Sequence, residues 1–171
     1  MVIEIGKKVY LAETAVLIGE VKLSDGVSVF DHSVLRGDLN QISIGTDSNI
    51  QDNVTIHVEK YHPTVIGRNV SVGHNAIIHG AKVEESVIVG MGAILLNGSH
   101  IRSGSVVAAG AVVREGFESE ENSIVAGIPA TTKKVDESVR KYAVKNGESY
   151  QKLRDRYLAG KVEKRYGKGE Q

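Results

Sequence analysis

Three of the six histidines, His57, His74 and His79, have a type and spacing suited to holding a metal ion. Neutral imidazole nitrogens are ligands for zinc, iron and cobalt, and imidazoles are also general bases near neutral pH. The chain has no cysteine, which excludes disulfides, thiolate ligands and cysteine nucleophiles. Whether the three imidazoles converge on one ion depends on the elements that carry them.

Those elements are predicted by a six-residue repeat between about residues 15 and 113, in which an aliphatic residue is often followed by glycine, as in Ile66-Gly67 and Val89-Gly90. A helix is excluded because its period is 3.6, and two-residue hairpin turns do not organise the pattern. Hexapeptide repeats are typical of a parallel β-helix, each hexamer forming one side of a coil. The predicted fold class is all-β, and the pattern resembles the left-handed β-helix shaped as a triangular prism.

Three hexamers per coil place every third aliphatic residue in one stack, with coils about 4.8 Å apart. One side of the prism, side one, then stacks Leu35, Ile56, Ile78 and Leu95, and another, side three, stacks Ile50, Val72, Val89 and Val107. Each side-one aliphatic is followed directly by a member of an outer column, which contains Arg36, His57 and His79. Asp52 and His74 form a second column on a different side.

This register predicts a metal site that one chain cannot complete. His57 and His79, one coil apart, are placed to share a cation. His74 lies on another side and reaches them only from a neighbouring subunit of a cyclic trimer, in which side one faces side three. The same docking brings Arg36 against Asp52 of the neighbour as an interface ion pair.

The chain resembles the γ-class carbonic anhydrases and the related ferripyochelin-binding-protein-like group over roughly residues 10 to 158. The resemblance rests on these segments: Leu35-Arg36-Gly37-Asp38, Ile50-Gln51-Asp52-Asn53-Val54, Ile56-His57, Val72-Gly73-His74 with His79-Gly80, Ala126-Gly127-Ile128-Pro129-Ala130, and a C-terminal helix with Asn146 and Tyr150.

The resemblance implies a homotrimer with three interface sites and Zn²⁺ as the metal, Fe²⁺ or Co²⁺ being the alternatives. His57 and His79 would come from one subunit and His74 from the next. A metal-bound hydroxide would convert CO₂ to bicarbonate, the reaction of a lyase.

Further residues take expected roles in that site. Gln51 would orient the hydroxide, and Asp38 would accept a hydrogen bond or relay a proton. Asn146 and Tyr150 would reach the rim of the site from the C-terminal helix.

One departure from the family pattern bears on activity. The prototype enzymes have an acidic residue after the Arg-Gly-Asp segment and an acidic loop that moves protons to water, whereas here Leu39 follows Asp38 and the loop 58–63 is short. Glu59 and His62 are the candidate replacements for the proton relay. We therefore expect low activity.

The C-terminal part departs from the repeat. Asp136 is the expected N-cap of an amphipathic helix that packs along the prism. The predicted domains are a β-helix over residues 1–122, a connecting segment and C-terminal helix over 123–160, and a disordered tail over 161–171.

Composition excludes some partners and leaves other functions open. Lysine plus arginine number 21, as do aspartate plus glutamate, so nothing favours nucleic acid or an anionic membrane. The N-terminus has no signal-peptide pattern and no apolar run is long enough to span a bilayer, so the expected location is cytoplasmic. A non-catalytic metal-binding or assembly protein and a hexapeptide acyltransferase remain alternatives on the same scaffold.

Overall fold

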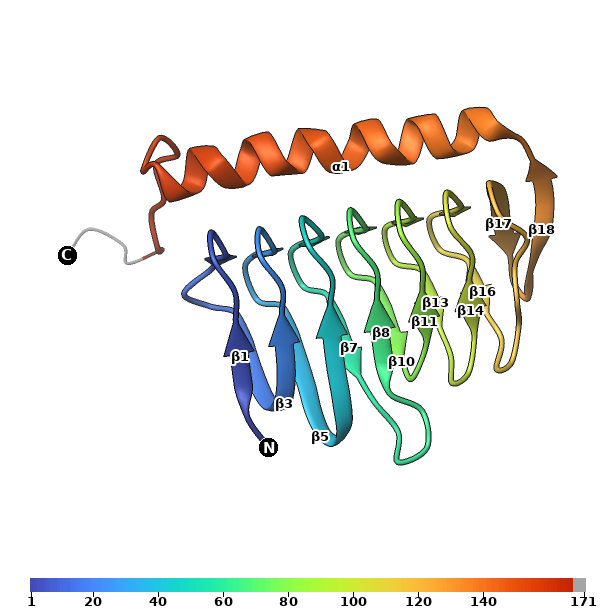
Figure 1. The fold of residues 1–171 in the computed structure, drawn as a ribbon, viewed down its shortest axis with the longest axis horizontal. Helices are drawn as coiled ribbons and strands as arrows, with labels where there is room; N and C mark the ends of the chain where they lie inside the picture. The colour runs from blue at the N-terminus through green and yellow to red at the C-terminus, as the bar shows by residue number, and fades with distance from the viewer. Residues whose placement is uncertain (168–171) are drawn as a thin grey trace.

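The computed structural model describes residues 1–167, which coil into a solenoid of short parallel strands with one long helix lying along it (Figure 1). The ten-stranded sheet contains β1 (Ile3–Ile5), β3 (Val16–Leu23), β5 (Val34–Ile44), β7 (Thr55–His57), β8 (Thr64–Ile66), β10 (Ile77–His79), β11 (Lys82–Val83), β13 (Ile94–Leu95), β14 (His100–Ile101) and β16 (Val112–Val113). The eight-stranded sheet contains β2 (Tyr10–Leu11), β4 (Ser28–Val29), β6 (Asn49–Ile50), β9 (Ser71–Val72), β12 (Ile88–Val89), β15 (Val106–Val107), β17 (Ser123–Gly127) and β18 (Ala130–Val135).

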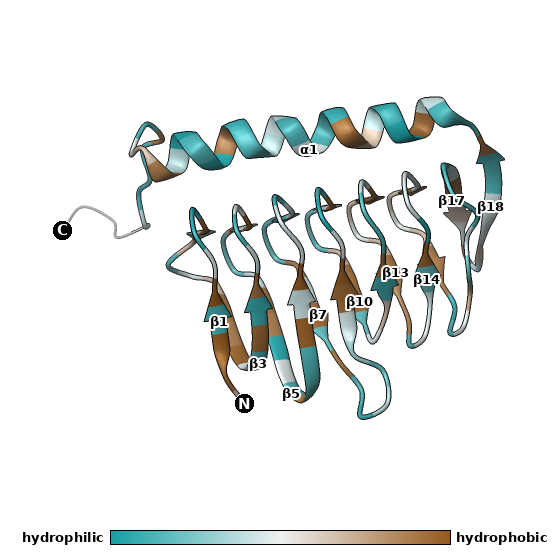
Figure 2. Cartoon of the chain, viewed as in Figure 1, coloured by the Kyte–Doolittle hydropathy of each residue, from teal (hydrophilic) through white to brown (hydrophobic). Residues whose placement is uncertain are grey.

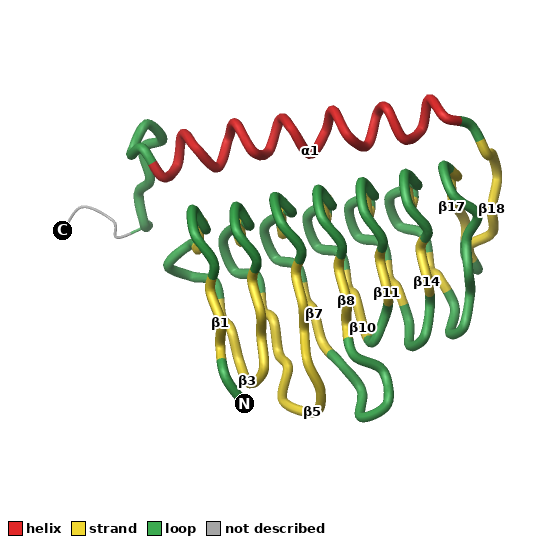
Figure 3. The backbone as a smooth tube through the Cα atoms, viewed as in Figure 1, coloured by secondary structure: helices red, strands yellow, loops and turns green. Residues whose placement is uncertain are grey.

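The larger sheet supplies two sides of the prism because β5 belongs to both. The first half of β5 pairs with β7 on side one. Its second half pairs with β8, and these strands form the remaining side of the prism, side two. The smaller sheet forms side three, and the antiparallel pair of β17 and β18 closes it at the C-terminal end. Apart from the longer β3, β5, β17 and β18, strands of two or three residues alternate with corners around the coils (Figure 3).

The core is the stack of inward aliphatic side chains that the repeat predicts. Leu35 pairs with Ile56, Ile56 with Ile78, and Ile78 with Leu95, and all four are fully buried. On side three, Ile50, Val72, Val89 and Val107 pair in the same way. Figure 2 shows hydrophobic residues along the strands. The predicted β-helix is confirmed.

The corner that follows side three repeats one backbone conformation in successive coils. A residue with positive φ stands there in each coil: His32, Asn53, Asn75, Gly92 and Gly110. Glycine and asparagine tolerate this conformation best, which explains their recurrence. The residues that immediately precede them therefore stand above one another at the corner.

The helix α1 (Glu137–Leu158) runs along the prism on the side of the smaller sheet, as predicted (Figure 1). The Asp136 carboxylate accepts a hydrogen bond from the Ser138 amide at 2.8 Å, so Asp136 is the predicted N-cap. Gly147 does not interrupt the helix. It lies against Asn69, whose Oδ1 would stand 2.1 Å from a Cβ at position 147, so glycine permits the close contact.

After the helix, residues 161–167 contain no strand or helix, and Lys164 Nζ contacts Asp31 Oδ1. The predicted tail extends to residue 171, and its last part, residues 168–171, lies outside the described residues. Among the helices of the described residues, none is both long and apolar enough to span a membrane.

Candidate metal centre

His57 and His79 stand side by side at the ends of β7 and β10. The two residues are direct partners in the parallel ladder, and Arg36 of β5 is the partner of His57 in the preceding coil. The predicted column of these three residues is therefore confirmed. The imidazole centroids lie 4.9 Å apart, and His57 Nδ1 lies 3.0 Å from His79 Nε2.

The protons of these two rings are positioned by oxygen acceptors on their far sides. His57 Nε2 lies 3.0 Å from Asp38 Oδ1, and His79 Nδ1 lies 2.7 Å from Asn97 Oδ1. In a neutral imidazole one nitrogen donates and the other accepts, so the protons belong on the nitrogens that face these oxygens. The nitrogens that face each other, His57 Nδ1 and His79 Nε2, then both present lone pairs.

Two lone pairs 3.0 Å apart repel each other unless a proton or a metal cation lies between the rings. Two Zn–N bonds of about 2.0–2.1 Å at a tetrahedral angle separate their nitrogens by roughly 3.3 Å. The observed separation is close to that value. The pair of histidines therefore fits two of the ligand positions of a tetrahedral metal.

Asp38 bridges His57 and Arg36, two neighbouring members of the column. Its Oδ2 accepts a hydrogen bond from Arg36 Nη1 at 2.6 Å, while its Oδ1 faces His57. The hydrogen bonds from Arg36 and His57 lower the pKa of the Asp38 carboxyl from its ordinary value. A carboxylate that remains ionised holds the His57 ring in one orientation and makes the opposite nitrogen a better ligand.

His74 lies apart from this pair, at the corner after β9 on side three. Its Nδ1 is 2.9 Å from Asp52 Oδ2, so the column of Asp52 and His74 forms within the chain. A carboxylate beside Nδ1 favours the proton on that nitrogen and leaves Nε2 as the basic one. Within residues 1–167, no group of three His, Cys, Asp or Glu side chains is placed to hold a metal ion.

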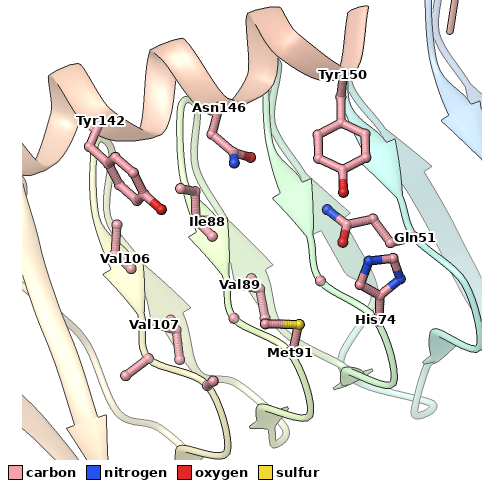
Figure 4. Close-up of a pocket in the computed structure, with 14 residues that line it drawn as sticks. Gln51, His74, Ile88, Val89, Met91, Val106, Val107, Tyr142, Asn146 and Tyr150 are labelled. Atoms are coloured by element: carbon pink, nitrogen blue, oxygen red, sulfur yellow. The ribbon is translucent and has the colours of Figure 1, made fainter. Parts of the chain in front are cut away.

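His74 also borders a cavity of about 410 Å³ between the helix α1 and side three (Figure 4). Tyr142, Asn146 and Tyr150 project into it from the helix, opposite Gln51 and His74 on the sheet side. Apolar residues line the remainder, and these include Ile88, Val89, Met91, Val106 and Val107. The structure thus brings Gln51, Asn146 and Tyr150 to the same cavity as His74 but not to His57 and His79 of the same chain.

Gln51 is held in one orientation by a buried polar chain beneath the helix. Its Nε2 donates to Asn49 Oδ1 at 3.1 Å, and Asn49 Nδ2 donates to Ser71 Oγ at 2.8 Å. These side chains are almost fully buried, and each polar group used here is paired. Because Nε2 is engaged, the Gln51 Oε1 oxygen is the atom that remains to accept a hydrogen bond in the cavity.

Tyr150 remains a hydrogen-bond donor across the physiological pH range. Burial and, secondarily, the negative charge of Asp52 raise the pKa of its phenol above the ordinary value. Its ring also packs edge-on against Phe30 at a centroid distance of 6.0 Å, which positions the hydroxyl.

The two candidate relay residues lie in the loop that follows His57. Glu59 and His62 pair through their backbones, with N···O distances of 3.1 and 3.0 Å. The Glu59 carboxylate accepts a hydrogen bond from the Tyr61 amide. The His62 side chain lies beside Gly80 and Gly98, at the same corner as His79.

The two residues proposed for the interface ion pair have partners within the chain. Arg36 donates to Asp38, and Asp52 contacts His74. Sequence reasoning missed Asn49 and Asn97, which orient Gln51 and His79. Asn49 stands two residues before Gln51, so the alternation of side chains along the strand could have placed the two on the same outward face. The sequence contains no such signal for Asn97, because this residue stands beside the column of Arg36, His57 and His79 rather than in it.

Comparison with known proteins identifies relatives of this chain. A family model described as the hexapeptide repeat of succinyl-transferase matches residues 63–97. The protein named "Probable carbonic anhydrase" of Methanocaldococcus jannaschii is 49% identical over 150 residues, which span 87% of this chain and 94% of that protein. "Gamma carbonic anhydrase 2, mitochondrial" of Arabidopsis thaliana is 49% identical over 100 residues, which span 55% of this chain and 36% of that protein.

A solved structure shares the fold along almost the whole chain. A hexapeptide transferase family protein from Anaplasma phagocytophilum superposes with a TM-score of 0.86 at 32% identity, covering 91% of this chain and 92% of that one. Proteins named for different activities thus share this prism. The fold alone therefore does not identify the activity, and the residues at the site must do so.

Proposed function

The chain belongs to the γ-carbonic anhydrase family, and from that premise we propose that it hydrates CO₂ reversibly to bicarbonate at a divalent metal shared between neighbouring subunits of a homotrimer. His57 and His79 of one subunit and His74 of the next supply the ligands. The observation that carries this proposal is that His57 Nδ1 and His79 Nε2 face each other 3.0 Å apart, while oxygen acceptors face the opposite nitrogens of both rings.

The trimer is supported by the outer surface of side one. The outward residues of successive coils form a mainly apolar ladder, in which the register pairs Val16, Val34, Thr55, Ile77, Ile94 and Val112 in turn; only Thr55 among them is polar. Val16 is 44% exposed and Ile77 38% exposed. A mainly apolar strip on a protein surface is typical of an interface, and this strip adjoins the His57 and His79 column.

Cyclic packing joins the two halves of the site. If side one of each subunit faces side three of the next, the Nε2 atom of His74 approaches the two facing nitrogens from the neighbour. The cavity beside His74, with Gln51, Asn146 and Tyr150, then becomes one wall of the active site. The same packing brings Arg36 towards Asp52 of the neighbour. In this proposal the ion pair between subunits forms in addition to the contacts of Arg36 with Asp38 and of Asp52 with His74 within one chain.

A divalent metal on three imidazoles supplies a Lewis acid that generates a nucleophile from water near neutral pH. Around it, the Gln51 Oε1 oxygen accepts a hydrogen bond and orients the attacking group. Asp38 fixes the His57 ring. The apolar wall of Val89, Met91 and Val106 suits an uncharged substrate such as CO₂, whereas Asn146 and the Tyr150 hydroxyl offer donors to the oxygens of the charged product.

Proton transfer to water is the step for which the site is least equipped. Leu39 is 59% exposed in the position that follows Asp38 and offers no titratable group. Glu59 and His62 provide the proton exit in this proposal, since His62 packs at the corner of His79. The Glu59 carboxylate is engaged with its own loop, so we propose slow turnover.

Zinc is the proposed metal, and Fe²⁺ and Co²⁺ are the alternatives. Imidazole nitrogens suit all three ions, and a site without thiolate or carboxylate ligands does not discriminate strongly between them.

Two other functions fit the same scaffold. The missing acid at Leu39 favours a protein that holds a metal without turnover. The match to a succinyl-transferase repeat and the hexapeptide transferase structure favour an acyltransferase. In a metal-free acyltransferase, however, the two facing nitrogens of His57 and His79 would share only a proton, and a third histidine from a neighbouring subunit would have no role beside them.

Stopped-flow CO₂ hydration on zinc-loaded and iron-loaded protein tests the proposal. We expect a rate above buffer with at least one metal and its loss in H79Q, which removes a ligand but keeps a polar side chain. Stoichiometric metal without hydration would leave the binding role alone. Absence of metal binding would refute both the CO₂ hydration and the metal-binding role, and would favour acyl transfer.

A further inference from the structure

Asn97 occupies the coil that follows His79 and faces the outer nitrogen of that ring. Its Oδ1 lies 2.7 Å from His79 Nδ1. The residue that continues the column above His79 is Leu96, which carries no polar group. Asn97, one position further along, provides the acceptor from the start of the turn that contains Gly98.

The backbone of Asn97 is held by the coils on both sides of it. The Gly98 amide donates to Gly80 O at 2.7 Å, and the Gly116 amide donates to Asn97 O at 3.1 Å. The position of the Asn97 side chain is thus set by the solenoid itself rather than by a mobile loop.

Gly80 leaves the space that the Asn97 amide occupies. A Cβ at position 80 would stand 2.6 Å from Asn97 Oδ1 and 2.8 Å from His62 Cβ. Gly80 also has a φ of +57°, which side chains rarely adopt. Any larger residue there would displace the amide from His79. The glycine that follows the histidine is therefore part of the arrangement that brings Asn97 to the ring.

We infer that Asn97 is a positioning residue that holds His79 in the tautomer with its proton on Nδ1, so that Nε2 is directed at the metal. The inference rests on the proposed function and deepens it. Asn97 does for His79 what Asp38 does for His57, but with a neutral amide in place of a carboxylate. An uncharged acceptor orients the ring without adding negative charge to a site that already contains Asp38, which preserves the Lewis acidity of the metal.

The tautomer is measured on the metal-free protein in an H57A background, because without a metal the facing nitrogen of His57 would itself compete for a proton on His79 Nε2. Long-range ¹H–¹⁵N correlation spectra distinguish protonated from unprotonated ring nitrogens, and a further H79Q substitution identifies the His79 signals among those of the remaining histidines. The spectra are recorded well above the ordinary imidazole pKa of about 6.5, where rings are neutral. In this background we expect His79 to be protonated on Nδ1 when Asn97 is present. Adding N97L should populate the Nε2-protonated form, whereas adding N97D should retain the Nδ1-protonated form.

Zinc affinity provides a second readout. Loss of an outer partner of a ligating histidine typically costs about 10–100-fold in metal affinity, so we expect a loss of that size in N97L and wild-type affinity or better in N97D. N40A is the matched control, because Asn40 donates to the loop carbonyls of Glu59 and Lys60 and touches neither imidazole. It should leave both the tautomer and the affinity unchanged.

Several results would overturn the inference. These are a His79 protonated on Nε2 in the H57A protein with Asn97 intact, an N97L substitution that changes neither the tautomer nor the zinc affinity, or an N97D protein as impaired as N97L. If N97L does not fold, the spectra of the H57A protein with Asn97 and with N97D decide alone. Because the spectra need no turnover, a protein without CO₂ hydration but with the expected tautomers would refute the proposed activity and support Asn97.

Discussion

The two halves of the proposed metal site are built to different degrees within one chain. On side one, His57 and His79 face each other, and Asp38 and Asn97 fix their far nitrogens. On side three, His74 has one carboxylate contact at an open corner, and its side chain is 40% exposed against 14% for His57. The first half is preorganised by the solenoid, and in the proposed trimer the second acquires its surroundings only when another subunit covers it.

If the site is shared as proposed, metal binding requires the trimer. A half-site with two convergent nitrogens binds a divalent metal weakly, and a lone imidazole more weakly still. Affinity should therefore follow the assembly, and any change that separates the subunits should also release the metal.

The largest expected effect is loss of the metal on removal of a ligand from either half. We expect H79Q and H74Q each to abolish stoichiometric zinc, measured by elemental analysis of the purified protein. H32Q, at an exposed corner, is the control and should keep its zinc. If H74Q retained full zinc while H79Q lost it, the second half would have no part in the site.

The next effect comes from breaking the apolar ladder without touching a ligand. I94E places a charge among the outward residues of side one, and we expect it to dissociate the trimer and to release the metal together. V65E is the control, since Val65 is an apolar residue on side two that is 39% exposed, whereas Ile94 is partly buried within the chain. Sedimentation velocity and zinc content report the two outcomes. A monomeric I94E protein with full zinc would contradict the coupling.

The two carboxylates that hold histidines should differ in importance. D38N weakens the acceptor of the enclosed His57, and we expect zinc affinity to fall about 10–100-fold. D52N acts on the more exposed His74, where water can replace the lost contact, and we expect a smaller fall. Competition with a zinc chelator measures both. Equal losses would show that His74 is as tightly held as His57.

On side two, which carries neither half of the site, we expect an effect on stability and none on metal binding. Burial there raises the pKa of Glu84, but hydrogen bonds from Ser103 and His100 outweigh it and lower this pKa to about 2. Because the pKa is lower folded than unfolded, the ionised carboxylate stabilises the fold above about pH 4.5. That stability is lost as the pH falls from about 4.5 towards 2.

E84Q should therefore cost on the order of 2–3 kcal/mol of unfolding free energy at neutral pH and progressively less as the pH falls towards 2. Denaturant melts at several pH values measure the difference. The zinc content of E84Q should equal that of the wild type. A stability loss independent of pH would show that the carboxylate charge is not responsible.

The sequence allowed the fold and one column of the site to be predicted because both follow from register. An aliphatic residue every six positions determines which residue stacks on which, so Arg36, His57 and His79 had to align. The same counting separated His74 from them.

What the repeat did not predict lies where side chains leave the column. Asn97 reaches His79 from a turn, and Gln51 is oriented by Asn49 beneath the helix. Gly147 lies within the unbroken helix, where the glycine admits the close contact with Asn69. Such details depend on the packing between coils and helix, which a periodic pattern does not encode.

Mixing two deficient subunits tests the shared site most directly. H79Q chains lack the first half and H74Q chains lack the second, so neither homotrimer should bind zinc. When the two chains are co-expressed, an interface is complete wherever an H74Q subunit meets an H79Q neighbour in the correct order, which random assembly gives at roughly a quarter of interfaces. Zinc and CO₂ hydration at about that fraction of the wild-type level are predicted. Mixed trimers without zinc would contradict the account.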